Sequence, residues 1–200
     1  HGWCGRSTQL FAFADKLLEN GYMVISFDGP AHGRSSGKTT MMPEFLETIK
    51  NINTTYGPFE AAIGHSFGAT SLYIAVSEFL TIKSLIAIGS GDKISDIILN
   101  FSKNLNLKKK SAQLIQSRLE KKWKIKVDDS SSSTVAKKIN IPVLVIHDKT
   151  DGDVPVKCAY EIRKNLNKGC LLITNTLGHT KILRNEEVIK KSINFIKQNT

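Results

Sequence analysis

Apolar and polar positions along the chain follow two alternating patterns, which together predict a parallel sheet covered by helices. Short runs that are apolar throughout indicate strands buried on both faces, and the chain has five of them: Tyr22–Phe27, Phe59–Gly64, Ser84–Gly89, Ile141–His147 and Leu171–Thr174. Helical spacing or helix-start residues mark the stretches between them: Arg6–Asn20, Pro43–Asn53, Ser66–Leu80, Pro155–Leu166 and Asn185–Gln198. This alternation is typical of the α/β class.

Residues 94–127 break the alternation, because they contain no strand. Two amphipathic stretches, Ile94–Leu105 and Ser111–Trp123, are joined by NLKKK, and a serine run at 130–134 leads back to the sheet. We therefore predict one domain over residues 1–200, with a small helical cap inserted at about residues 93–128.

The composition excludes several classes of protein. Of the 200 residues, 40% are hydrophobic and 23% are charged, which is typical of a globular chain and not of a disordered one. No apolar run approaches the ~20 residues that a membrane-spanning helix needs, and no secretory signal is recognisable. Three cysteines, Cys4, Cys158 and Cys170, fit a reducing cytoplasm better than a disulfide framework. Without Cys-x-x-Cys or paired histidines, we expect neither a metal nor a cofactor.

The net charge of +10 is concentrated in one segment. Between Lys103 and Lys126, nine basic residues stand against Glu120 alone, an excess of +8. Such a segment is usually a solvated helix face, although it could attract acidic substrates or an anionic surface. Nucleic acid is not an expected partner, because aromatic side chains for base stacking are scarce there.

A glycine-rich loop, GPAHGRSSGKTT, follows the first predicted strand and raises the question of a phosphate-binding P-loop. A P-loop needs four residues between its first glycine and Gly-Lys, whereas only three separate Gly33 from Gly37. A helix starting at the Lys-Thr pair would also place Pro43 in its second turn, where proline costs about 3 kcal/mol. We therefore do not expect nucleotide binding.

The second predicted strand ends in GHSFG, a Gly-x-Ser-x-Gly pattern between a strand and a helix of small residues. The glycines at 64 and 68 let strand and helix approach closely, so that Ser66 lies on a tight, strained turn with its hydroxyl exposed. The turn also directs the N–H of Phe67 towards the place where an oxyanion would form. An ordinary tight turn could carry the same letters, but the strand–turn–helix context predicts a nucleophile.

A nucleophilic serine needs a base, and the base needs an orienting acid. Parallel strands bring their carboxyl ends to one crevice, and there the fourth strand leads into HDKTDGDVP and the fifth into LGHTKIL. His179 in the last segment is the expected base. The orienting acid stays open among four carboxylates: Asp151, which is favoured, Asp153, which could instead cap the next helix, Asp148 and Asp92.

In this order, the segments resemble the α/β-hydrolase family over essentially the whole chain. HGW at 1–3 is similar to the family's oxyanion-hole turn, and FDGPAHGRSSG at 27–37 to its Asp-x-x-Gly-His-Gly-x-Ser loop, with Ala31 replacing a glycine. GHSFG resembles the nucleophile elbow, HDKTDGDVP the acid block, with Asp148 replacing a glycine, and LGHTKIL the histidine block. This alignment favours Asp151 as the acid and implies a structural role for Asp28.

The resemblance implies the α/β-hydrolase fold and a serine hydrolase that cleaves a carboxylic ester of a small molecule. Ser66 would be the nucleophile, His179 the base and Asp151 the acid, with the N–H groups of Trp3 and Phe67 as oxyanion hole. Cleavage of a peptide, thioester or carbon–carbon bond by the same triad, or a non-catalytic binding role, are the alternatives. The oligomeric state is not predicted.

The N-terminus departs from this pattern, because such a sheet has a strand leading into HGWCG and none precedes His1. We therefore expect that N-terminal strands of the sheet are missing from this sequence, which would leave Trp3 without its anchoring strand. A version extended at the N-terminus is expected to be more stable and more active than the 200-residue chain.

Overall fold

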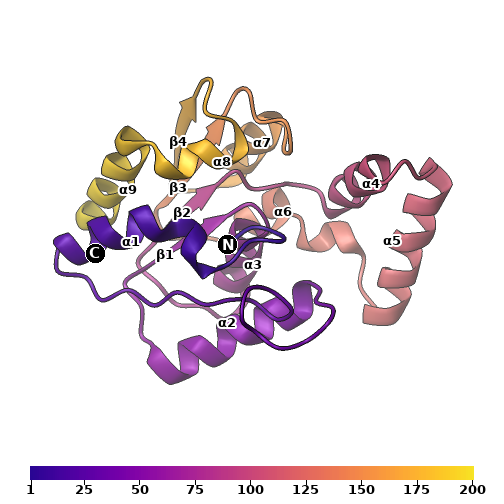
Figure 1. Ribbon diagram of the computed structural model, residues 1–200, viewed down its shortest axis with the longest axis horizontal. Helices are drawn as coiled ribbons and strands as arrows, with labels where there is room; N and C mark the ends of the chain where they lie inside the picture. Colours follow the sequence, from indigo (N-terminus) through magenta and orange to yellow (C-terminus); the bar gives the residue numbers. More distant parts are fainter.

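The computed structural model describes residues 1–200 and is built around a parallel sheet (Figure 1). Its four strands follow one another in the order of the sequence: β1 (Ala61–His65), β2 (Ser84–Ile88), β3 (Val143–Asp148) and β4 (Gly169–Thr174). Ile63 of β1 lies opposite Ile86 of β2, which lies opposite Leu144 of β3. Because all four strands are parallel, the loops that follow them gather at one edge of the sheet.

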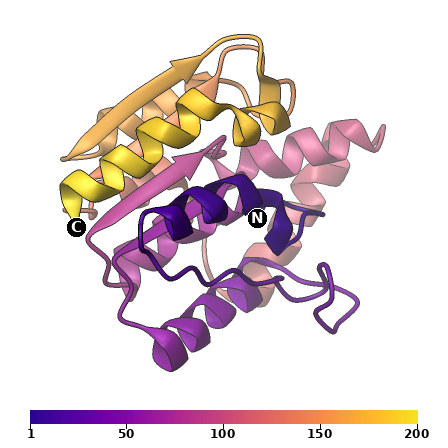
Figure 2. The same ribbon diagram turned by 60° about the vertical axis from the view of Figure 1, so that its left-hand side comes forward.

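Helices cover both faces of the sheet. Leu85 and Ala87 face a core shared with four helices: α2 (Met42–Tyr56), α3 (Phe67–Glu78), α6 (Ser132–Ala136) and α7 (Lys157–Asn165). Ile86 and Ile88 face the opposite core, which is closed by three elements: α1 (Phe11–Glu19), η3 (Ile182–Arg184) and α9 (Glu186–Asn199). Figure 2 shows α1 and α9 side by side on that face. The predicted class, α/β with helices on both faces, is confirmed.

The helix starts follow local chemistry. Pro43 stands in the first turn of α2, where a proline loses no helical hydrogen bond, and the Glu44 carboxylate accepts the N–H of Met41 at 3.1 Å. Asn185 caps α9 by accepting the N–H of Val188 at 3.0 Å. These signals agree with the helix starts expected near Pro43 and Asn185.

The prediction of a strand at Tyr22–Phe27 is wrong. This segment has no strand structure, and none of the backbone N–H groups of residues 23–28 donates to another backbone group. A strand exists only where a neighbour accepts its hydrogen bonds, and here a groove separates the segment from β1, the edge strand of the sheet. Apolar letters alone do not reveal that the neighbour is absent.

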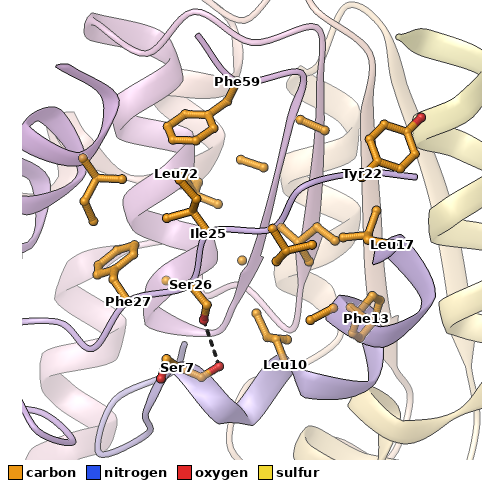
Figure 3. Close-up of a pocket in the computed structure, with 18 of the residues that line it drawn as sticks. Ser7, Leu10, Phe13, Leu17, Tyr22, Ile25, Ser26, Phe27, Phe59 and Leu72 are labelled. Carbon is orange, nitrogen blue, oxygen red and sulfur yellow. Dashed lines mark hydrogen bonds between the residues drawn. The ribbon is translucent and has the colours of Figure 1, made fainter. Parts of the chain in front are cut away.

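This groove has a volume of about 590 Å³. Figure 3 shows Tyr22, Ile25 and Phe27 on one side of it and Phe59 and Leu72 on another. Apolar side chains of α1, α2 and β1 also line it. It therefore lies within the body of the fold, between elements that would otherwise share a core.

The segment without strands forms a helical hairpin. Its arms are α4 (Ile94–Asn104) and α5 (Lys109–Trp123), and η2 (Val127–Ser130) follows them. The hairpin extends from one side of the sheet and away from it (Figure 1, right). The division of residues 1–200 into one domain with a cap at about 93–128 stays a prediction.

Candidate active site

Ser66 lies on the turn between β1 and α3 in a backbone conformation that is rare for a residue with a side chain. Its φ is 52° and its ψ is −119°, and its N–H is held by the carbonyl of Ile88 at 2.8 Å. A Cβ on Gly64 would approach the backbone of Ala69 to 2.8 Å, so only glycine permits this contact of strand and helix. The GHSFG segment thus forms the strained strand-to-helix turn that its letters predict.

His179 and Asp151 meet at the same edge of the sheet. His179 lies in α8 (Gly178–Lys181), just after β4, and Asp151 lies in the loop after β3. The Nδ1–H of His179 donates to Oδ2 of Asp151 at 2.7 Å, and the carboxylate is almost fully buried. This bond leaves the Nε2 atom of a neutral imidazole as the proton-accepting atom.

Asp151 is also held by its own loop, because its Oδ1 accepts the N–H groups of Asp153 at 2.9 Å and Val154 at 2.8 Å. Burial alone would raise the pKa of Asp151, but the hydrogen bonds from His179, Val154 and Asp153 outweigh it and lower the pKa below its usual value. The carboxylate is therefore ionised at neutral pH.

The other three carboxylates left open by the sequence form no hydrogen bond with His179. Asp153 is exposed, and no side chain caps α7. Asp92 is buried and accepts the N–H of Ser133 at 2.8 Å. Asp148 accepts the Thr174 hydroxyl at 2.6 Å and the Leu177 N–H at 3.0 Å, and so joins the loops that carry Asp151 and His179.

The ring of His179 packs beside the turn that carries Ser66. The Nε2–H of His65, the residue before Ser66, donates to the carbonyl of His179 at 2.9 Å, and the two rings are 4.5 Å apart. Ser66 and His179 thus approach on the same edge of the sheet. No hydrogen bond joins the Ser66 hydroxyl to the His179 ring.

Two histidines that the sequence analysis did not assign support this site. Burial, and secondarily the charge of nearby His179, lower the pKa of His65 to about 3, so that its ring is neutral. His147 is fully buried, and its Nε2–H donates to the carbonyl of Val154 at 2.9 Å while lying 3.4 Å from Oδ2 of Asp151. The position of His65 directly before the serine was an available signal, but its acceptor lies 114 residues away.

The turn at residues 1–3 also lies close to Ser66. A Cβ on Gly2 would lie 3.1 Å from the Cβ of Ser66, and the rings of Trp3 and Phe67 pack edge to face at 5.1 Å. The backbone N–H groups of Trp3 and Phe67 have no acceptor within the protein. Two free N–H donors therefore lie on adjoining turns beside the serine.

The loop at 28–37 holds this turn in place. Asp28 accepts the N–H of Ser7 at 2.6 Å and that of Arg34 at 2.8 Å, and these bonds lower its pKa to about 2. His1 accepts the N–H of Gly29 through Nε2 at 2.8 Å, and His32 accepts that of Cys4 at 3.1 Å. The glycine-rich loop thus binds the N-terminal turn through Asp28, Gly29 and His32.

One group of side chains could offer ligand atoms to a metal ion: Asp151, Asp153 and His179, whose atoms lie within 4.8 Å of one another. The closest pair of these atoms is already joined by the His179–Asp151 hydrogen bond. A metal would have to break that bond, so we assign no metal to the group.

Comparisons with known proteins agree with this architecture. Residues 111–198 match the family model described as TAP-like protein. No curated protein matches the chain by sequence. No helix meets the length and apolarity needed to cross a bilayer.

Solved structures similar to this chain include several named hydrolases. An esterase from Exiguobacterium antarcticum is 17% identical, with a TM-score of 0.77, over 98% of this chain and 90% of that one. A lipase-esterase related protein from Clostridium acetobutylicum is 19% identical, with a TM-score of 0.71, over 95% and 89%. A bromoperoxidase from Bacillus anthracis is 16% identical, with a TM-score of 0.74, over 98% and 90%. This chain has the α/β-hydrolase fold.

Proposed function

We propose that the protein is a serine hydrolase that cleaves a carboxylic ester of a small molecule through an acyl-enzyme on Ser66. The observation that carries the proposal is the convergence at one sheet edge of a strained serine, a histidine bonded to a buried carboxylate, and two backbone N–H groups without acceptors. The names of the structural neighbours, an esterase among them, agree with this reaction class.

The first half of the reaction forms the acyl-enzyme. The Ser66 oxygen attacks the ester carbonyl while its proton moves to Nε2 of His179. The negative charge that develops on the carbonyl oxygen is bound by the N–H groups of Phe67 and Trp3. Collapse of this intermediate breaks the ester bond, and the alcohol leaves with the proton from His179.

The second half repeats the steps with water as the nucleophile. His179 takes a proton from water, the hydroxide attacks the acyl carbon, and the acid is released as Ser66 regains its proton. Asp151 stays ionised throughout, because its lowered pKa keeps it charged, and it holds the ring in the tautomer that exposes Nε2.

Ser66→Ala tests the proposal most directly. We expect it to reduce hydrolysis of short p-nitrophenyl esters on the order of 10⁶-fold and to abolish labelling by a fluorophosphonate probe. Ser77→Ala is the matched control, because Ser77 lies on the same helix and bonds only the carbonyl of Ile74. Equal labelling of wild type and Ser66→Ala would refute the proposal, and a panel of thioesters and peptides would test the alternative bond types.

We also propose that the protein works in a reducing compartment, the cytoplasm. Its three cysteines, Cys4, Cys158 and Cys170, are all free, and two of them are exposed. A mature protein whose thiols are found oxidised in cells would contradict this placement.

A further inference from the structure

The α4–α5 hairpin exposes large apolar side chains that nothing in the protein covers. Phe101 is 52% exposed, Leu105 54% and Leu107 42%. All three lie in the turn between the two helices or in the last turn of α4 before it. Ile97 and Phe101 precede Leu105 at intervals of four residues, so the three form one stripe along α4. Such a stripe on a projecting hairpin marks a surface built for contact.

Most of the net charge of the protein lies in the segment Lys103–Lys126, which covers the turn, α5 and the residues just after it. The nine basic residues of this segment are all exposed, and none forms an ion pair: Lys103, Lys108, Lys109, Lys110, Arg118, Lys121, Lys122, Lys124 and Lys126. The one acidic residue among them, Glu120, already accepts hydrogen bonds from Gln116 and from the N–H of Val127. The positive charge is therefore free to act outwards.

We propose that the α4–α5 hairpin docks on an anionic lipid surface, with Phe101, Leu105 and Leu107 entering the interface and Lys103 and Lys108–Lys110 contacting the headgroups. Apolar side chains set among lysines are the combination that binds charged bilayers. These residues lie together in the sequence, because they span the turn between α4 and α5. Figure 1 shows that turn on the projecting hairpin.

Other occupants fit these observations less well. A second copy of the chain would bring two surfaces of excess +8 together, and like charges would oppose the contact. Nucleic acid would use stacking aromatic rings, and leucines dominate the turn. A small anionic substrate would leave the exposed leucines without a role.

The experiment measures cosedimentation of the protein with vesicles of phosphatidylglycerol and phosphatidylcholine, compared with phosphatidylcholine alone. We expect binding to the anionic vesicles only, and we expect it to weaken as salt rises from 20 to about 300 mM. Lys108→Gln with Lys109→Gln and Lys110→Gln should lower the partition coefficient on the order of 100-fold. Leu105→Ser with Leu107→Ser should lower it at least about tenfold.

Matched controls lie outside the hairpin. Met23→Ser removes an apolar side chain that is 84% exposed, and Lys137→Gln with Lys138→Gln and Lys168→Gln removes three exposed lysines. Neither control should change vesicle binding. A Leu107→Trp variant should shift its emission to shorter wavelength on anionic vesicles, which a purely electrostatic contact would not cause.

Several outcomes would overturn the proposal. These are equal binding to both vesicles, equal losses in controls and hairpin variants, or no binding at 20 mM salt. Binding to nucleic acid without vesicles, or concentration-dependent dimers lost in Leu105→Ser with Leu107→Ser, would assign the surface to another partner. None of these readouts depends on ester hydrolysis, so the docking proposal and the catalytic proposal stand or fail separately.

Discussion

Two regions of the molecule meet at Ser66, and they are held together in different ways. Asp151 and His179 follow β3 and β4, whose backbones are fixed by a continuous ladder from Val143 to Thr174. Residues 1–40 contribute the N–H of Trp3 but join no ladder. Side chains fix the backbone of this region instead. Asp28, His1 and His32 accept hydrogen bonds from N–H groups of turns that form no part of a sheet ladder.

This difference predicts which parts of the site are most sensitive to substitution. Ladder hydrogen bonds are many and share strain, so one substitution in β3 or β4 leaves the rest in place. The N-terminal region depends on single acceptors, each of which fixes a loop. Changes there are expected to disturb oxyanion binding while leaving the His179–Asp151 pair intact. Changes in the loops after β3 and β4 are expected to disturb the His179–Asp151 pair while leaving oxyanion binding intact.

Asp151→Asn should have the largest effect on the ladder side. The amide cannot hold the Nδ1–H tautomer of His179 as a carboxylate does, so we expect kcat to fall about 10⁴-fold. The melting temperature should change little by comparison, because the loop bonds to Asp153 and Val154 need only an oxygen acceptor. A loss below tenfold would show that Asp151 does not orient the base.

Gly68→Ala should have the largest effect on the N-terminal side. A Cβ there would lie 2.7 Å from the carbonyl oxygen and 2.9 Å from the nitrogen of His1, both backbone atoms, so the turn at 1–3 must move. We expect kcat to fall about 10²–10³-fold, the cost of a lost oxyanion donor. Fluorophosphonate labelling should persist at a reduced rate, since His179 and Asp151 are untouched.

Gly152→Ala is the control for this change, because no heavy atom lies within 4 Å of a Cβ at that position. It stands in the loop of Asp151, yet it should leave kcat unchanged. If Gly68→Ala were as active as Gly152→Ala, the N-terminal turn would have no part in catalysis.

The sequence predicted the ladder region more accurately than the N-terminal one, for a physical reason. Strands β2 and β3 are buried on both faces, so most of their positions are apolar and each run can be recognised without knowing its neighbours. Tyr22–Phe27 reads in the same way, but whether it becomes a strand depends on a partner and not on its own letters. None of its six residues is buried and Met23 is 84% exposed, so the apolar pattern alone predicted neither burial nor pairing here.

The site shows the same limit. Ser66 and its flanking glycines are readable because the turn is local, and the resemblance favoured Asp151, the carboxylate that bonds His179. The support from His65 was not predicted, since it joins β1 to a carbonyl after β4. Contacts between distant segments decide such roles, and no spacing rule encodes them.

A strand fused to the N-terminus would test whether the N-terminal region becomes more stable when it forms its own ladder of backbone hydrogen bonds. We expect a Val- and Ile-rich extension of about six residues before His1 to enter the groove between β1 and Tyr22–Phe27. Melting temperature should rise by several degrees, at about 2–4 °C per kcal/mol for a chain of this size.

A Ser- and Gly-rich extension of the same length is the control, because it lengthens the chain equally without filling the groove with apolar side chains. An equal rise for both extensions would show that the gain does not come from a strand in the groove. No rise for either would show that the groove does not accept a strand.

The contact between His65 of β1 and the His179 loop should make the stability of the protein depend on pH. The pKa of His65 is lowered to about 3 in the folded protein by burial and by His179, whereas the unfolded residue titrates near 6.5. Between these values the unfolded chain binds the extra proton, so the stability that neutral His65 supports is full above pH 6.5 and is lost as the pH falls towards 3. In the middle of that window, one such group contributes a slope of about 1.4 kcal/mol per pH unit to the free energy of unfolding. His65→Gln should therefore flatten the curve of unfolding free energy between pH 6.5 and 4.5, measured by urea titration, while keeping an N–H donor for the carbonyl of His179. Parallel curves for the two proteins would mean that His65 titrates in the folded state as it does in the unfolded state, and that its ring is not buried.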